Sequence, residues 1–407
     1  MSKNCQRCGA TLNEDASFCT NCGLKLELEP ENKSKVCASC GATMGPEAKF
    51  CASCGKSCNP QNEWTQGEVG AADFVKNSMN RVANSLNQKM GESGPVEVKL
   101  SDLFSEVPVK HTQEELEELF IAGTKKTTPK ESEIIAQWPK PWVYSRVFAF
   151  LFAVCLILYF GISQFDNWNC VPGFIFMAAM SVPFSLVIFF WEMNAPRNIS
   201  AINIFTMFFV GGVLSMVFTL FLFTVTQPGE LTYVGAMLVG LTEEVGKIAI
   251  AALYIKKTNA KYILNGLLIG ACIGAGFAAF ETAGYGFRTF LGGGMNGMLH
   301  ILLLRGATGV GTHIIWTAIA GAALVAAKGE KPFDFSMLLH GRFLFFLCIS
   351  IVFHGLWDSP LEFPSLYGKY TISVLLAWGI TLVMISSGLK QITRLTNRGG
   401  ELQRQNS

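Results

Sequence analysis

The stretch Leu231-Thr-Tyr-Val-Gly-Ala-Met-Leu-Val-Gly-Leu-Thr-Glu243-Glu244-Val-Gly-Lys247-Ile-Ala-Ile-Ala-Ala-Leu-Tyr-Ile255 decides the fold of this chain. It is mostly apolar and long enough to cross a lipid bilayer, which takes about 20 residues. Its middle carries Glu243, Glu244 and Lys247, where a charge costs about 2.5–3.5 kcal/mol on insertion scales. An ion pair between Glu243 and Lys247, at i and i+4, would leave Glu244 unexplained. We therefore expect a membrane helix whose charged face serves a function inside a bundle or a wet cavity.

The composition places this helix in a larger membrane protein. The chain has 407 residues, of which 50% are hydrophobic and 15% charged, and it contains 32 Phe. Its mean hydropathy of +0.35 is too high for an ordinary soluble protein. The net charge of +2 gives no basic field, so a nucleic-acid partner is not indicated.

The apolar segments predict an all-α polytopic membrane protein of about eight spanning helices. The expected spans are approximately 145–164, 171–191, 199–224, 231–255, 262–284, 298–327, 337–358 and 370–390. Most Lys and Arg residues between the spans fall on one side, and the other side carries little besides Arg288 and Lys369. By the positive-inside rule both termini are cytoplasmic, which predicts a multi-pass protein of a prokaryotic plasma or inner membrane.

Two copies of a cysteine pattern precede the spans. Each copy has two CxxC pairs followed by Gly, and the candidate metal ligands are Cys5, Cys8, Cys19 and Cys22 in the first copy and Cys37, Cys40, Cys51 and Cys54 in the second. Two such pairs close a tetrahedral four-thiolate site, which suits structural zinc and leaves no position open for catalysis. Disulfides would need an oxidising compartment, which a cytoplasmic N-terminus does not provide. The pattern predicts zinc ribbons at 1–28 and 35–58, and a protein partner for them is left open.

A polar segment joins the ribbons to the membrane domain. Residues 59–138 are interpreted as a cytoplasmic linker with amphipathic helices, the first over Asp73–Met90. This helix is expected to lie on an anionic membrane surface or to be a plain linker helix. Thr112 and Glu115 predict a capping box for a further helix that Gly123 stops. The membrane domain is expected at 139–395, and a cytoplasmic tail at 396–407.

More ionisable residues lie inside the later spans. Glu281 is in the fifth span, His313 is near the middle of the sixth, and His354 and Asp358 stand at i and i+4 in the seventh. With alternating topology, carboxylates and imidazoles from neighbouring helices can meet in a cavity that opens outward. Such a collection suits activation of a water molecule by a carboxylate base, with His residues as metal ligands or hydrogen-bond donors.

These motifs resemble those of the PrsW-type intramembrane proteases. The resemblance covers about 140–395 and rests on Glu243-Glu244-x-x-Lys247, Phe277-x-x-x-Glu281, the His313 segment, His354-x-x-x-Asp358 and the loop Trp191-Glu192-Met-Asn-Ala-Pro196. The related type II CAAX-prenyl proteases show EExxxR, FxxxH and HxxxN instead. This chain departs from that pattern at Lys247, Glu281 and Asp358, which favours the PrsW family.

The resemblance implies hydrolysis of peptide bonds in or beside the membrane, with a membrane protein such as a single-pass anti-sigma factor as substrate. It implies that Glu243 activates water, that Glu244 is a second ligand or orienting group, and that Lys247 neutralises a carboxylate. His313 and His354 would bind a metal or stabilise the oxyanion, with Asp358 orienting His354. A catalytic metal is left open, with a preference for a glutamate-activated water, because Lys247 and Glu281 also fit a network of ion pairs and hydrogen bonds.

Two other classes of function compete with a protease. The first is a catalytically inactive membrane scaffold whose zinc ribbons recruit a partner. The second is a transporter or proton relay, since intramembrane Glu and His residues serve that purpose too. Transporters often show repeat symmetry between their halves, whereas here the polar residues gather in the second half of the chain. The order of preference is therefore enzyme, scaffold, transporter.

Overall fold

The fold is taken from a computed structural model, which describes residues 3–4, 8–9, 11–12, 21–22, 35–36, 43–45, 71–363 and 365–405. The chain divides into two compact units, Met1–Phe74 and Val75–Ser407. Among the predicted zinc ligands only Cys8 and Cys22 are described. The other six lie outside the described residues: Cys5, Cys19, Cys37, Cys40, Cys51 and Cys54.

The first unit contains two short antiparallel hairpins. In the first hairpin β1 (Lys3–Asn4) pairs with β2 (Thr11–Leu12), and in the second β3 (Lys35–Val36) pairs with β4 (Thr43–Met44). The stretch between β1 and β2 contains Cys8, whose Sγ accepts a hydrogen bond from the Asn21 side chain at 3.7 Å. The two hairpins recur at the same positions in each copy of the cysteine pattern, so the sequence repeat is also a structural repeat.

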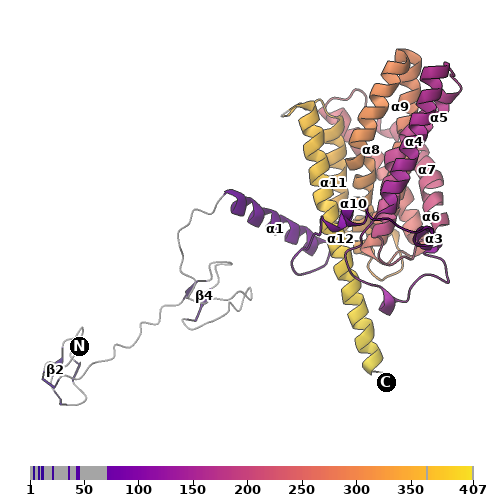
Figure 1. The fold of residues 1–407 in the computed structure, drawn as a ribbon. Coiled ribbons are helices and arrows are strands. Elements are labelled where there is room, and N and C mark those ends of the chain that lie inside the picture. The colour runs from indigo at the N-terminus through magenta and orange to yellow at the C-terminus, as the bar shows by residue number, and fades with distance from the viewer. Residues whose placement is uncertain are drawn as a thin grey trace. The chain divides into compact units, whose positions relative to one another are not determined.

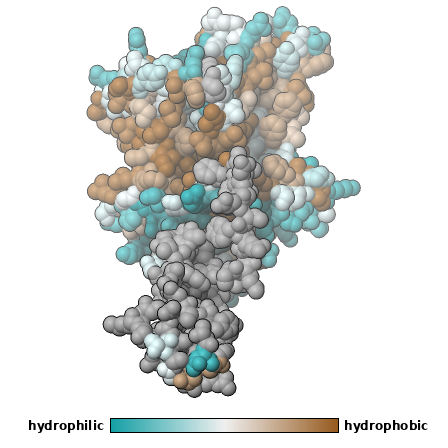
Figure 2. Space-filling model, turned by 90° about the vertical axis from the view of Figure 1, so that its left-hand side faces the viewer, coloured by the Kyte–Doolittle hydropathy of each residue, from teal (hydrophilic) through white to brown (hydrophobic). Residues whose placement is uncertain are grey.

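The second unit is a helical bundle (Figure 1). Its elements in chain order are α1 (Ala71–Lys89), α2 (Asp102–Ser105), α3 (Gln113–Ile121), η1 (Glu131–Glu133), α4 (Val143–Phe165), α5 (Cys170–Met193), α6 (Ala201–Phe205), η2 (Thr206–Gly211), α7 (Gly212–Thr226), α8 (Tyr233–Thr258), α9 (Ile263–Thr308), η3 (Gly309–Gly311), α10 (His313–Lys328), η4 (Phe335–Leu339), α11 (Gly341–Asp358) and α12 (Leu366–Gln405). On the face shown in Figure 2, hydrophobic residues form a belt around the middle of this unit, with hydrophilic residues beyond it at both ends. Such a belt is what a bilayer-spanning bundle needs.

The predicted all-α membrane fold is confirmed. By length and composition, six helical stretches among the described residues could cross a membrane. One of them, Ile263–Lys328, has 66 residues and reverses direction at Gly294 (φ 63°, ψ −158°), so it makes two passes. The helix α8 has 26 residues and is also long enough, although its three central charges make it less apolar. Together these give about eight passes.

The two passes of Ile263–Lys328 form a tight antiparallel hairpin at the centre of the bundle. Gly266, Gly270 and Gly274 recur every four residues on α9, and a Cβ at any of them would collide with backbone atoms of α10. Small residues at this spacing let two membrane helices approach closely. The hairpin therefore fixes the start of α10 against α9.

The predicted sixth span, 298–327, is not one continuous helix. The 3₁₀ turn η3 and Thr312 (φ −106°, ψ −133°) interrupt it directly before His313. Irregular backbone at membrane depth is tolerated where it is buried in protein or lines a cavity. The break makes His313 the first residue of α10, whereas the sequence placed it inside a continuous helix.

The sequence assigns 59–138 to a cytoplasmic linker with amphipathic helices. Its part from the end of α1 onward packs against one end of the bundle, whereas Val75, Met79 and Val82 earlier in α1 are exposed. The buried Asn87 of α1 accepts a hydrogen bond from Ser387 of α12 at 2.7 Å. Glu92 pairs with Arg394 of the same helix at 2.8 Å. The helix α1 matches the expected amphipathic helix closely, and the capping box of Thr112 and Glu115 is present at α3. The expected tail at 396–407 continues α12 as far as Gln405.

The last turn of α5 and the loop that follows it tie three helices together. The Glu192 carboxylate accepts hydrogen bonds of 2.7–2.9 Å from the backbone amides of 142–144 at the start of α4. The buried Asn265 near the start of α9 donates to Asn194 at 2.8 Å and to Asn198 at 2.7 Å. This part of the resemblance motif therefore holds helix ends in place, away from the intramembrane carboxylates.

Candidate active site

The seven polar residues predicted for the site come together across four helices. They are Glu243, Glu244 and Lys247 on α8, Glu281 on α9, His313 at the start of α10, and His354 and Asp358 on α11. Each lies within ion-pair distance of at least one other member. The structure leaves none of them apart, and their catalytic roles remain predictions.

The Lys247 ammonium lies at the centre of this cluster and its side chain has no exposed surface. Its Nζ is 2.7 Å from Glu244 Oε1, 3.4 Å from Glu243 Oε2 and 2.9 Å from His313 Nδ1. It also lies 4.4 Å from the centre of the Phe277 ring. Since an ammonium has three N–H donors, these three acceptors satisfy it. Lys247 thereby joins both carboxylates of α8 to the histidine of α10.

His354 connects the carboxylates of α8 with that of α11. Its Nδ1 is 2.9 Å from Glu244 Oε1, and its Nε2 is 3.3 Å from Asp358 Oδ2 and 3.6 Å from Glu243 Oε2. The two helices can approach because α8 has Gly240 at the contact, where a Cβ would stand only 2.9 Å from the backbone of α11. Glu244 therefore fixes the orientation of the imidazole, and Nε2 is left facing Glu243 and Asp358.

His313 is held from two sides. Its Nε2 is 3.0 Å from Glu281 Oε2, while its Nδ1 faces the Lys247 ammonium. The close contact of Gly274 with the His313 backbone sets the position of the ring along α9. A lysine can only donate, so Nδ1 is the acceptor and Nε2 carries the proton that is shared with Glu281. The neighbours of His313 thus select one tautomer.

Two residues outside the predicted set complete the network. Arg305 pairs with Glu281 at 2.5 Å and donates to Thr282 at 2.9 Å. Thr317 donates to Glu244 Oε2 at 3.4 Å. The signal for Arg305 was present in the sequence, because an intramembrane cation in the same span as His313 is a functional candidate by itself. No comparable signal marks Thr317, since a threonine is common in membrane helices.

A cavity of about 590 Å³ opens beside the cluster. Five of the seven predicted residues line it: Glu243, Glu281, His313, His354 and Asp358. Neighbouring helix residues point about 100° apart, so a regular helix cannot aim two successive side chains at one narrow site. Here Glu243 faces the cavity, and Glu244 is buried behind it with 1% of its side chain exposed. Gly246 packs against Thr219 of α7, where a Cβ would collide with the Thr219 hydroxyl.

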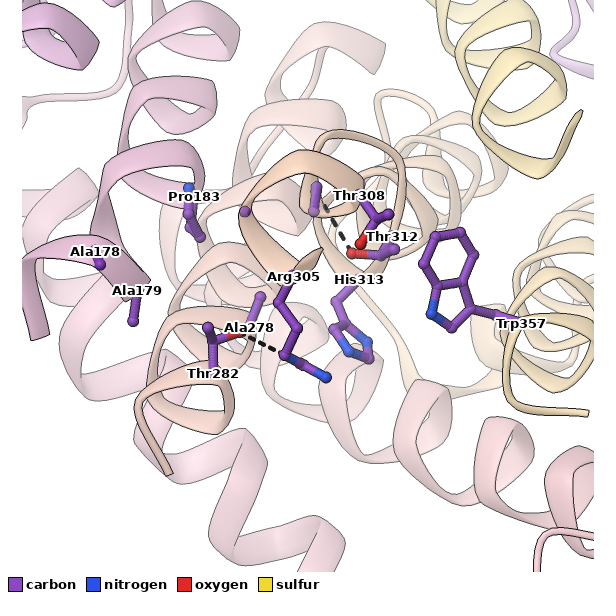
Figure 3. A pocket seen from close by; sticks show the side chains of 12 residues that line it. Ala178, Ala179, Pro183, Ala278, Thr282, Arg305, Thr308, Thr312, His313 and Trp357 are labelled. Carbon is purple, nitrogen blue, oxygen red and sulfur yellow. Dashed lines mark hydrogen bonds between the residues drawn. The ribbon is translucent and has the colours of Figure 1, made fainter. Parts of the chain in front are cut away.

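A second, smaller cavity of about 40 Å³ adjoins the cluster on the side of α5. Figure 3 shows Arg305 and His313 reaching toward the same space, with the Trp357 indole at its opposite side. A cavity of this size has room for one or a few water molecules where polar groups line it. The interrupted stretch from Thr308 to Thr312 also borders it.

The donor set fits a divalent metal ion by type and spacing. Glu243, His313 and His354 each offer one ligand atom, and these atoms lie within 4.8 Å of one another. Donors around tetrahedral zinc stand roughly 3.4 Å apart, and Glu243 Oε2 is 3.6 Å from His354 Nε2 and 4.0 Å from His313 Nδ1. A carboxylate on the far nitrogen of a metal-binding histidine, as Glu244 provides, is common at such sites. Binding through His313 Nδ1 would require Lys247 to give up its contact there.

The comparisons with known proteins agree with this geometry. Residues 195–385 match the model of the PrsW family of intramembrane metalloproteases, and residues 5–55 match the model of the double zinc ribbon. All seven predicted site residues lie inside the first match, which is shorter than the stretch of 140–395 expected from the sequence. No curated protein and no solved structure matches the chain.

Proposed function

We propose, from the premise that residues 195–385 are a PrsW-family protease domain, that this chain hydrolyses peptide bonds of membrane proteins by a glutamate-activated water. The observation that carries the proposal is the position of Glu243. Its carboxylate lines the large cavity, while the ion pairs and hydrogen bonds of the cluster hold it from behind. A carboxylate that is open to substrate on one side and fixed on the other is the arrangement that a general base requires.

In this mechanism Glu243 takes a proton from a water molecule whose oxygen attacks the scissile carbonyl carbon. The C–N bond then breaks, and Glu243 returns the proton to the leaving amine nitrogen. Lys247 compensates the negative charge of Glu243 and Glu244 throughout. The Nε2 atom of His354 faces the cavity beside Glu243, where as a donor it would stabilise the oxyanion.

Glu243, His313 and His354 would hold a metal ion if the site takes one. A bound zinc would lower the pKa of its water and polarise the scissile carbonyl. The metal content of the purified chain tests this directly, since His313→Ala together with His354→Ala should remove one equivalent of zinc per chain and leave the ribbon zinc in place. Equal metal content in both proteins would contradict a resident ion at this site.

We further propose that both termini face the cytoplasm of a prokaryotic cell and that the ribbons bind two structural zinc ions through their eight cysteines. The orientation is supported by four cations that bind the polar segment 92–131 at one end of the bundle. They are Arg146, Lys261, Lys390 and Arg394. The positive-inside rule assigns such an end to the cytoplasm. Thiolates are stable there, which suits zinc ribbons. A cysteine-accessibility assay in intact cells would contradict this orientation if it labelled the ribbon end from outside.

The proposed substrate class is a single-pass membrane protein, such as an anti-sigma factor. To test for cleavage, the full chain would be reconstituted in vesicles with a panel of labelled single-pass peptides. The unaltered chain should cleave at least one of them, and Glu243→Gln should not. Glu230→Gln is the matched control, because Glu230 is an exposed carboxylate just before α8. Cleavage that survives Glu243→Gln would refute the mechanism, and no cleavage by any form would favour the scaffold alternative.

A further inference from the structure

One charged residue at the large cavity has no role in the network described above. Arg288 lies on α9, is exposed, and lines the same cavity as Glu243. In the described part of the chain its guanidinium lies 4.6 Å from the centre of the Tyr285 ring and has neither an ion pair nor a hydrogen bond. The carboxylates of the cluster pair with Lys247, Arg305 and the two histidines and not with Arg288, so its guanidinium is available to a partner from outside this set.

The position of Arg288 runs against the expected distribution of charge. The sequence places few cations on the non-cytoplasmic side, chiefly Arg288 and Lys369. Lys369 is buried and serves the structure, because its Nζ donates to the carbonyls of Trp357 and Ser359 at the end of α11. Arg288 has no such structural task. A cation that lies on the non-cytoplasmic side, where few are expected, and that stabilises no part of the fold suggests a site for an anionic ligand.

Tyr285 connects this cation to the site. The Tyr285 ring also lies 4.6 Å from the guanidinium of Arg305, which is paired with Glu281. A ring next to two guanidinium groups is a favourable cation–π arrangement and restricts the positions that Arg288 can take. Arg288 is therefore held toward the cavity by a residue that is itself fixed to the cluster.

The separation of Arg288 from Glu281 along α9 can be compared with the length of a bound substrate chain. Arg288 follows Glu281 by two turns of α9, which corresponds to about 10 Å along the helix. An extended chain advances about 3.3 Å per residue, so this distance spans about three residues of a substrate bound in extended form. The rest of the cavity wall on the α7 and α8 side is mostly apolar, with Met216, Leu220, Phe223 and Val239 beside the single hydroxyl of Thr219.

We infer that Arg288 binds a carboxylate side chain of the substrate, about three residues from the scissile bond toward the non-cytoplasmic side. The inference rests on the proposed function and names a substrate feature for the same cavity: an apolar segment with an Asp or Glu on its non-cytoplasmic side. A lipid phosphate is the rival occupant. The substrate carboxylate is favoured because Arg288 lines the cavity that contains Glu243 and is held there by Tyr285.

The test is a binding assay that needs no turnover. The full chain with Glu243→Gln is placed in phosphatidylcholine vesicles with labelled single-pass peptides that carry Asp or Lys at successive positions. At one position Asp should bind about tenfold more tightly than Lys, as expected for a charge-assisted hydrogen bond. Adding Arg288→Glu should reverse this preference. Lys257→Glu is the matched control, because Lys257 is an exposed cation over Tyr254 outside the cavity.

Three results would overturn the inference. The first is equal binding of Asp and Lys peptides at every position. The second is an unchanged preference in the Arg288→Glu variant. The third is loss of the Asp preference in vesicles rich in phosphatidylserine, which would assign Arg288 to lipid phosphate. Absence of cleavage by the unaltered chain would count against the proposed function only, since peptide binding is measured separately.

Discussion

The helix α4 and the hairpin of α9 and α10 have similarly apolar sequences and opposite environments. Of the most apolar window of α4, 17% is buried inside the protein, against 94% for Ile263–Lys328. The helix α4 carries large side chains on every face, and several of them, such as Phe150 and Ile157, are exposed. The hairpin instead carries Gly every fourth residue along its contact. Hydrophobicity therefore marks both as spans, and the spacing of small residues decides which of them is central.

The comparison also explains where the polar residues lie. Charges are tolerated at membrane depth only where other protein groups satisfy them. The central hairpin and its neighbours α8 and α11 supply such groups, whereas the middle of α4 has no Asp, Glu, Lys, Arg or His. Four predictions test this contrast between the centre and the periphery, and they follow in order of expected effect.

The largest effect is expected from removing the cation at the centre of the cluster. Lys247→Met should destabilise the protein by about 3–5 kcal/mol, because it leaves buried carboxylates without their partner. Unfolding of the purified protein in mild detergent measures the loss. The double variant Lys247→Met with Glu244→Gln should recover part of it. A single variant as stable as the unaltered protein would show that the ion pairs contribute nothing to the fold.

The next effect concerns the hairpin contact itself. Gly270→Ala should cost about 3 kcal/mol or more, since the new Cβ meets backbone of α10 that cannot move aside, and overpacking is expensive there. Gly284→Ala on the same helix is the control, because a Cβ at Gly284 meets nothing within 4 Å. Thermal unfolding of the two variants under the same conditions compares their losses of stability. Similar losses in both would refute the close contact.

A smaller effect is expected at the contact that joins the peripheral helix α4 to the end of α5. Glu192→Gln weakens the charge-assisted bonds to the backbone amides of 142–144 and should cost about 1.5–3 kcal/mol. Hydrogen exchange should rise at the first turn of α4 and stay unchanged in α10. Increased exchange across the whole hairpin would mean that α4 is not a separate peripheral element.

The smallest effect is expected on the lipid-facing side of α4. Phe150 is 65% exposed within the protein, so Phe150→Leu should change stability by less than about 0.5 kcal/mol. The same unfolding assay applies. A loss above that level would show that α4 packs against something else, for example a second copy of the chain.

Much of this arrangement could be predicted from the sequence. The spans follow from hydrophobic length, and intramembrane charge singled out seven residues that the structure brings into one cluster. The two spans 262–284 and 298–327 predicted a reversal between them, and Gly294 lies in that gap. The break before His313 could not be predicted, because it does not change the average hydrophobicity of the stretch. The packing of 87–138 against the bundle could not be predicted, because its polar side chains, such as Asn87 and Glu92, are satisfied by partners about 300 residues away in α12. Long-range pairs of this kind leave no local pattern.

The central claim is that Glu243, and not its neighbour Glu244, is the base that activates water. The most direct test is the rate of peptide cleavage in vesicles for the unaltered chain and Glu243→Gln, with folding checked by thermal unfolding. The account predicts that Glu243→Gln remains folded and loses about 10²–10⁴-fold in rate, the usual contribution of a general base. A folded Glu243→Gln variant that cleaves within a few-fold of the unaltered rate would contradict it.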